Sequence, residues 1–162
     1  MAGADITGAD AWKLTAGNPE VSVAIVDEGW KNTHPDLAAN MWINPNPSPE
    51  YKNQDIHGWN FAADGPISWG QKGDSGHGTH VAGTVAAVNN NGIGVCGVAG
   101  GTGKGDGVRL MSCQIFSGDL TGDALVSSRA VKYAADHGAS ILQCSWGIKA
   151  GIYKSDNMSL KK

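Results

Sequence analysis

Three stretches of almost unbroken apolar residues predict buried β-strands. They cover residues 21–26, residues 108–116 and residues 139–145. Uninterrupted apolar runs of this length are typical of parallel strands that are covered on both faces. Residues 58–61 form a shorter strand candidate. The chain is therefore expected to build a mainly parallel sheet.

Two segments between the predicted strands have the periodicity of helices. In the first, which starts at His77, five apolar residues recur at helical spacing, and Gly83 is expected to let another backbone pack close. The second, residues 123–137, begins with an acid and stops at Gly138. Residues 5–16 are predicted to form a short lead-in that covers one face of the core. This order of elements predicts an α/β fold, a doubly wound parallel sheet with helices on both faces.

Length and composition narrow the class of protein. A chain of 162 residues suits one domain, and its 24 glycines and 17% charged residues indicate a turn-rich α/β protein. The net charge of −3 offers no basic face for nucleic acid. No apolar run is long enough for a membrane span, and no signal peptide is recognisable, so the signal of an exported protein would lie outside this chain.

The cysteines do not indicate a disulfide framework. Cys96, Cys113 and Cys144 make an odd count, and each lies in an apolar context. We expect three buried free thiols. A nucleophilic cysteine would need a cationic neighbourhood that these segments do not show.

Asp27 and His77 are the candidates for chemistry. Asp27 closes the first predicted strand, and polar groups at the carboxyl ends of parallel strands meet at one edge of the sheet. His77 begins a helix, whose positive end keeps the imidazole neutral unless an acid opposes it. A turn-forming Asp and a turn His are the ordinary alternatives. A zinc pair of His77 with His80 is disfavoured, because the metalloprotease motif spaces its histidines further apart and places a Glu beside the first.

With these residues located, the chain resembles the subtilisin-like serine proteases, the subtilases. Residues 23–29 are similar to the segment that carries the family's catalytic aspartate, although Glu28 stands where a small hydroxyl residue is usual. Residues 34–37, His-Pro-Asp-Leu, follow at the family's spacing. Residues 77–84 match the family's histidine motif without a change, and residues 145–147 resemble the wall of its primary specificity pocket.

The resemblance covers nearly all of residues 12–147 and implies a serine endopeptidase mechanism. His77 would take a proton from a serine hydroxyl and return it to the leaving amine, while Asp27 would hold the imidazole in the right tautomer. A polypeptide substrate would lie as an extended strand between two backbone segments. The substrate-binding residues implied in this way are Gly118, Gly122, Ser145, Trp146 and Gly147.

The resemblance also implies a structural calcium ion. Residues 89–99 are similar to the family's loop after the histidine helix, and oxygen ligands suit this hard cation. A solvated Asn-rich turn is an equal alternative. The implied ligands are Asp36, Val88, Asn91, Ile93 and Val95, with Asn90 as a competing side-chain ligand.

By this resemblance, residues 1–162 are the N-terminal portion of a subtilase catalytic domain that is secreted or bound to the cell envelope. The family's Gly-Thr-Ser-Met-Ala-like serine motif and its oxyanion asparagine match nothing in the chain, and Ser145, Ser155 and Ser159 lack that context. We therefore expect the chain alone to have no peptidase activity. A non-catalytic relative that binds peptides or a partner is the alternative, but the intact Asp27 and His77 favour the protease.

The resemblance has one consequence for assembly. In the family, the strand that ends at Ser145 pairs with a later strand. Without that partner the strand becomes a sheet edge, which invites self-association unless residues 148–162 cover it.

Overall fold

A single sheet organises the computed structural model, which describes residues 6–147. Its strand order is β2-β3-β1-β5, and a short fifth strand, β4, pairs with β3. The pairings along this order are parallel, whereas β4 is antiparallel to β3. The strands are β1 (Ser22–Glu28), β2 (Gly58–Asn60), β3 (Arg109–Ser117), β4 (Leu120–Thr121) and β5 (Ile141–Gln143).

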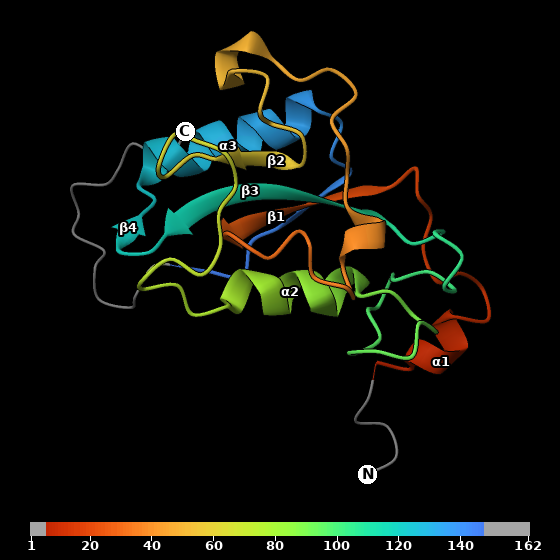
Figure 1. Cartoon of the computed structure of the whole chain (residues 1–162). Coiled ribbons are helices and arrows are strands. Elements are labelled where there is room, and N and C mark those ends of the chain that lie inside the picture. The colour runs from red at the N-terminus through yellow and green to blue at the C-terminus, as the bar shows by residue number, and fades with distance from the viewer. Residues whose placement is uncertain (1–5, 148–162) are drawn as a thin grey trace, which may run out of the picture.

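Helices cover the two faces of this sheet (Figure 1). The helix α2 (His77–Ala86) lies on one face and α3 (Ala124–Asp136) on the other, which confirms the predicted doubly wound α/β architecture. Asp123 caps α3, because its side chain accepts a hydrogen bond from the backbone N–H of Val126 at 2.8 Å. The shorter helices are α1 (Gly8–Ala11) and the 3-10 turns Ala38–Asn40 and Pro49–Tyr51.

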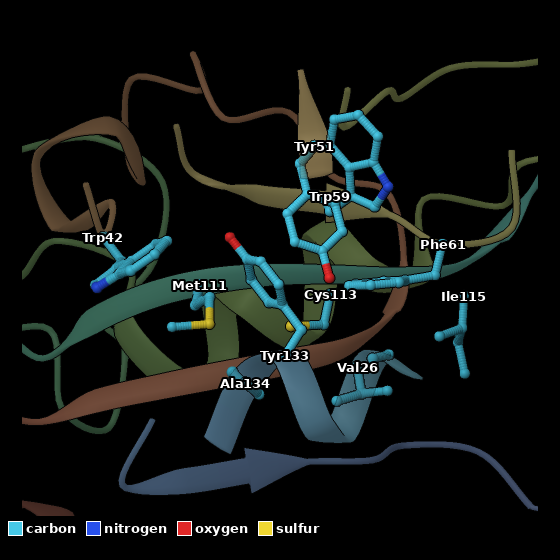
Figure 2. Close-up of a cluster of buried hydrophobic side chains, with 12 residues drawn as sticks. Val26, Trp42, Tyr51, Trp59, Phe61, Met111, Cys113, Ile115, Tyr133 and Ala134 are labelled. Atoms are coloured by element: carbon cyan, nitrogen blue, oxygen red, sulfur yellow. The ribbon is translucent and has the colours of Figure 1, made fainter. Parts of the chain in front are cut away.

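The apolar run of β1 is explained by burial on both faces. Ala24 and Val26 point into the core under α3, and Val23 and Ile25 point into the core under α2. The α3 side is rich in aromatic rings (Figure 2). Its large side chains are Trp42, Tyr51, Trp59, Phe61 and Tyr133.

Three expectations about burial are wrong. Of the three cysteines only Cys113 is buried, where desolvation raises the pKa of its thiol, while Cys96 and Cys144 are exposed. The lead-in does not cover the core, since α1 buries no residue and Trp12 instead donates from its indole N–H to the carbonyl of Val98 at 2.8 Å. The third predicted strand is shorter than expected, and its Ile141 is 51% exposed.

The exposure of β5 follows from its position in the sheet. It pairs with β1 on one side, and within residues 6–147 no strand pairs with its other side. Leu142 is 36% exposed for the same reason. Residues 148–162, whose cover of this edge was the stated alternative to self-association, lie outside the described residues.

The close approach of α2 to the sheet occurs at Gly78, not at Gly83. A Cβ atom at Gly78 would lie 2.4 Å from the carbonyl oxygen of Glu28, whereas a Cβ at Gly83 would meet no atom within 4 Å. The first turn of α2 therefore rests directly on the end of β1. This contact brings His77 to Asp27.

Candidate active site

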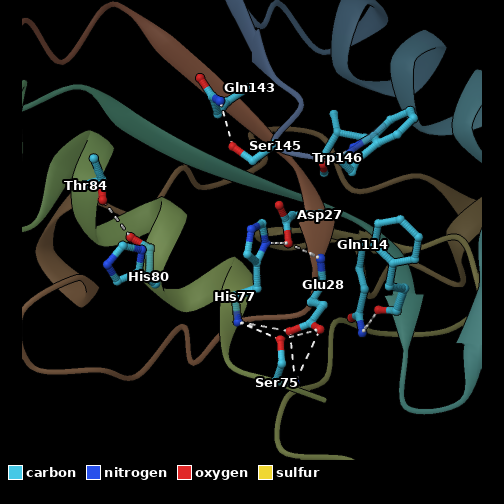
Figure 3. A network of polar contacts seen from close by, with 12 residues as sticks. Asp27, Glu28, Ser75, His77, His80, Thr84, Gln114, Gln143, Ser145 and Trp146 are labelled. Carbon is cyan, nitrogen blue, oxygen red and sulfur yellow. Dashed lines mark hydrogen bonds and ion pairs between the residues drawn. The ribbon is translucent and has the colours of Figure 1, made fainter. Parts of the chain in front are cut away.

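Asp27 and His77 form a hydrogen-bonded pair at the carboxyl edge of the sheet (Figure 3). The distance between His77 Nδ1 and Asp27 Oδ1 is 2.8 Å. The Asp27 side chain is 1% exposed, and the His77 side chain is 47% exposed. A buried carboxylate thus orients a ring that is partly exposed to solvent.

The end of β1 fixes the direction of the Asp27 carboxylate. Asp27 lies opposite Gln114 of β3, and the register then shifts at Glu28. Asp27 Oδ1 also accepts a hydrogen bond from the backbone N–H of Glu28 at 2.7 Å. The other oxygen, Oδ2, is buried without a hydrogen-bond partner among the described residues. The carboxylate therefore has His77 as its side-chain partner.

Asp27 changes the acid–base behaviour of His77. The hydrogen bond to Asp27 raises the pKa of His77, the charges of Asp27 and Glu28 act in the same direction, and partial desolvation opposes them. In the neutral ring, a proton on Nδ1 donates to Asp27 and leaves the lone pair of Nε2 as a proton acceptor. The arrangement suits a general base whose protonated form is stabilised in place.

The first predicted substrate-binding segment is a tight hairpin on β3. Phe116 pairs with Thr121, and Gly118 occupies the turn with a φ of +58°. The N–H of Gly118 donates to Asp74 Oδ1 at 2.7 Å, which ties the hairpin to the loop before α2. A Cβ atom at Gly122 would lie 2.7 Å from the Ile115 carbonyl oxygen, so the chain crosses β3 closely there.

The second predicted segment follows β5. The Ser145 hydroxyl accepts a hydrogen bond from the Gln143 side chain at 2.9 Å. The indole N–H of Trp146 donates to the carbonyl of Val26 at 2.7 Å, and its ring packs edge-on against Phe116 with centroids 6.3 Å apart. Trp146 thus links the ends of β1 and β3, next to Asp27. A Cβ atom at Gly147 would meet no atom within 4 Å.

The predicted calcium ligands come together only in part. The buried Asp36 carboxylate accepts hydrogen bonds from the Asn91 side-chain amide at 2.7 Å and from the Val95 N–H at 2.9 Å. The Asn91 amide oxygen accepts from the N–H of Ile93 at 3.1 Å. Asn90 is directed elsewhere, donating to the Thr102 carbonyl at 3.2 Å.

The cradle around Asp36, formed with Asn91 and Val95, contains a carboxylate and a side-chain amide, two of the ligand types that calcium takes. The loop presents the N–H of Val95 to Asp36. In this arrangement the NH₂ group of Asn91, not its oxygen, faces Asp36. Rotation of that amide would present an oxygen instead. Within residues 6–147 no cluster of three or more His, Cys, Asp or Glu residues could hold a metal.

Glu28 is a site residue that the sequence reasoning did not assign. Its carboxylate contacts Ser75 and the backbone of His77, residues that are 47 and 49 positions away in the chain. The available signal was its departure from the small hydroxyl residue that is usual after the catalytic aspartate. The direction of its side chain depends on the packing of α2 against β1, which no local pattern reveals.

Comparison with known proteins agrees with the geometry. The Subtilase family model matches residues 18–162. Thermitase from Thermoactinomyces vulgaris is 31% identical over 90% of this chain and 44% of its own length, and halolysin from Haloferax mediterranei is 32% identical over 85% of this chain and 23% of its own. The chain therefore spans less than half of these relatives.

Solved structures agree on the fold. The crystal structure of fervidolysin from Fervidobacterium pennivorans, described as a keratinolytic enzyme related to subtilisin, superposes with a TM-score of 0.55 at 28% identity, over 85% of this chain and 18% of that one. The match to the family model covers nearly the whole chain, and Asp27 at the end of β1 contacts His77 at the start of α2, the Asp and His of its motifs. The chain belongs to the subtilase family.

Proposed function

We propose that this chain supplies the aspartate and histidine of a subtilisin-type serine endopeptidase. The 2.8 Å contact between Asp27 and His77 Nδ1 carries the proposal, because it leaves Nε2 as the proton acceptor. In the reaction, Nε2 removes the proton of a serine hydroxyl as that oxygen attacks the peptide carbonyl, and then delivers it to the leaving amine. Asp27 stabilises the imidazolium that forms between these steps. The serine and the oxyanion donors belong to the remainder of a complete catalytic domain.

The substrate in this proposal is a polypeptide in extended conformation. Two exposed backbone segments near His77 support it, the hairpin around Gly118 and residues 145–147. Backbone pairing of this kind binds peptides with little demand on their sequence. Secretion or attachment to the cell envelope is proposed from the family alone. Within residues 6–147 no helix has the length and apolar character of a membrane span.

A hybrid catalytic domain tests the proposal. Residues 18–147 of this chain are joined to the following segment of a subtilase that contains the family's serine motif, and hydrolysis of a chromogenic peptide is measured. We expect turnover, and a loss of at least about a thousandfold in kcat in the His77→Ala variant. His80→Ala is the matched control, because His80 is exposed on the same helix and should be dispensable.

The outcome that would contradict the proposal is equally definite. A folded hybrid with an unchanged melting temperature, whose turnover is the same in His77→Ala and His80→Ala, would show that His77 is not the base. A peptide-binding protein without turnover would then be the better description.

We also propose that the Asp36 cradle binds calcium after rotation of the Asn91 amide. The support is the buried carboxylate wrapped by the loop of residues 91–95. Calcium at one hundred times its dissociation constant would stabilise the fold by about 2.7 kcal/mol. The thermal midpoint should therefore rise on adding calcium and fall with a chelator. An Asp36→Asn variant should lose this response, and an identical midpoint with and without calcium in the parent protein would refute the site.

A further inference from the structure

The helix α2 starts without a cap of its own. Its N-cap residue is Gly76, which has a φ of +81° and no side chain to accept a hydrogen bond from the first turn. The first N–H groups of any helix lack partners within the helix. His77 is the first residue of α2, so its backbone N–H has no acceptor within the helix.

A carboxylate from β1 supplies the nearer of two acceptors. Glu28 Oε2 accepts the backbone N–H of His77 at 3.1 Å, and the hydroxyl oxygen of Ser75, which is itself bonded to Glu28, accepts it at 3.3 Å. Glu28 Oε1 accepts the hydroxyl of Ser75 at 2.9 Å, and both oxygens lie 3.2 Å from the N–H of Ser75. Two neighbouring residues of one strand end therefore contact His77, Asp27 at its ring and Glu28 at its backbone (Figure 3).

Consecutive strand residues normally point to opposite faces of a sheet. The register shift between Asp27 and Glu28 interrupts the ladder at this point. Glu28 is also long enough to reach back to the loop before α2. A small hydroxyl residue, usual at this position in the family, has no side chain that spans this distance.

We propose that Glu28 is a positioning residue for His77, an inference that rests on the proposed role of His77 as the base. Its carboxylate holds the backbone at Ser75 and His77, so that the imidazole stays aligned with Asp27. As a negative charge at the positive end of α2, it also favours the imidazolium form that the reaction creates.

Other charged and titratable groups also lie near this loop. Lys31 lies over the ring of Trp69, 4.8 Å from its centroid. Asp74 accepts hydrogen bonds from the N–H groups of Gln71 and Gly118. Partial desolvation raises the pKa of the Cys144 thiol, and the charge of the nearby Asp27 raises it further. Asp27 and Glu28 are the charges that raise the pKa of His77.

The test compares Glu28→Gln and Glu28→Ala with Glu20→Gln in the 162-residue protein. Glu20 is exposed in the turn before β1 and serves as the control. NMR measures the pKa of His77 and the amide hydrogen exchange of Ser75 and His77. We expect both Glu28 variants to lower that pKa. We expect exchange at both amides to accelerate at least about tenfold in Glu28→Ala and less in Glu28→Gln, which keeps one acceptor oxygen.

In the hybrid enzyme, Glu28→Gln should lower kcat about tenfold with little change in KM, because the base is misplaced while the two proposed peptide-binding segments are unchanged. An unchanged pKa and unchanged amide exchange in Glu28→Gln would overturn the proposal. The proposal would also be overturned if His77→Ala inactivates the hybrid but Glu28→Gln has the same kcat as Glu20→Gln. A hybrid that His77→Ala leaves active would instead refute the proposed function.

Discussion

Asp27 is almost fully buried while the His77 ring is nearly half exposed, and this difference determines how the pair responds to pH. The pKa of His77 is raised from its ordinary value of 6.5, chiefly by the hydrogen bond to Asp27. A raised pKa in the folded state means that protonation of His77 stabilises the fold. This contribution is complete below 6.5 and disappears as pH rises through the raised pKa.

The prediction at this scale concerns Asp27→Asn. We expect the free energy of unfolding of the parent protein to exceed that of Asp27→Asn by the largest margin near about pH 5, and the margin to shrink toward about pH 9. Urea denaturation across this range measures it. His77→Gln should remove the same pH-dependent part, and a margin that grows with pH would contradict the assigned sign.

The sequence predicted functional residues that stand at the end of a strand or at the start of a helix. Asp27 closes an apolar run and His77 opens a helix, so the pattern located both. Glu28, Ser75 and Asp74 were not found, because their contacts join segments that are distant in sequence. Such contacts depend on how α2 packs on β1.

At the scale of elements, the first turn of α2 is the critical contact. An alanine in a helix is more favourable than a glycine by about 1 kcal/mol. Replacing a glycine of α2 with alanine should therefore stabilise the protein wherever the added Cβ has room. Gly83 has that room and Gly78 does not. The two positions therefore form a matched pair within one helix.

We expect Gly83→Ala to stabilise the protein by up to about 1 kcal/mol and Gly78→Ala to destabilise it by about 1–3 kcal/mol. Thermal or urea unfolding measures both. Since the Glu28 carbonyl, 2.4 Å from a Cβ at Gly78, would have to move and follows Asp27 directly in the chain, Gly78→Ala should disturb the His77 signals in NMR spectra. Equal stabilisation by both replacements would show that α2 does not rest on β1 as described.

The elements themselves were predictable to different degrees. The runs over β1 and β3 are buried on both faces, so their sequence carries the signal throughout. No sequence pattern marks the two-residue strand β4, because Leu120 and Thr121 are both exposed. The burial expected for β5 was wrong because a strand's apolar sequence does not reveal which of its neighbours are present.

At the scale of the whole molecule, β5 has an edge that pairs with no strand among residues 6–147. Ile141 and Leu142 present apolar side chains there, and unpaired strand edges promote association between chains. We expect the 162-residue protein to self-associate as its concentration rises, through this edge.

Leu142→Lys should reduce the association, because a charge on an edge strand opposes pairing. Leu125→Lys is the control, since Leu125 is an exposed apolar residue on α3, away from the edge. Light scattering over a concentration series measures the difference. A parent protein that stays monomeric at high concentration, or equal effects of the two variants, would rule out association through β5.

The most direct test of the Asp27–His77 pair is the tautomer of His77 at neutral pH. ¹⁵N NMR of the imidazole distinguishes a proton on Nδ1 from one on Nε2. The structure predicts the Nδ1–H form, with a downfield proton that disappears in Asp27→Asn. A neutral ring protonated on Nε2, unchanged in Asp27→Asn, would contradict the assignment of His77 as the base of this site.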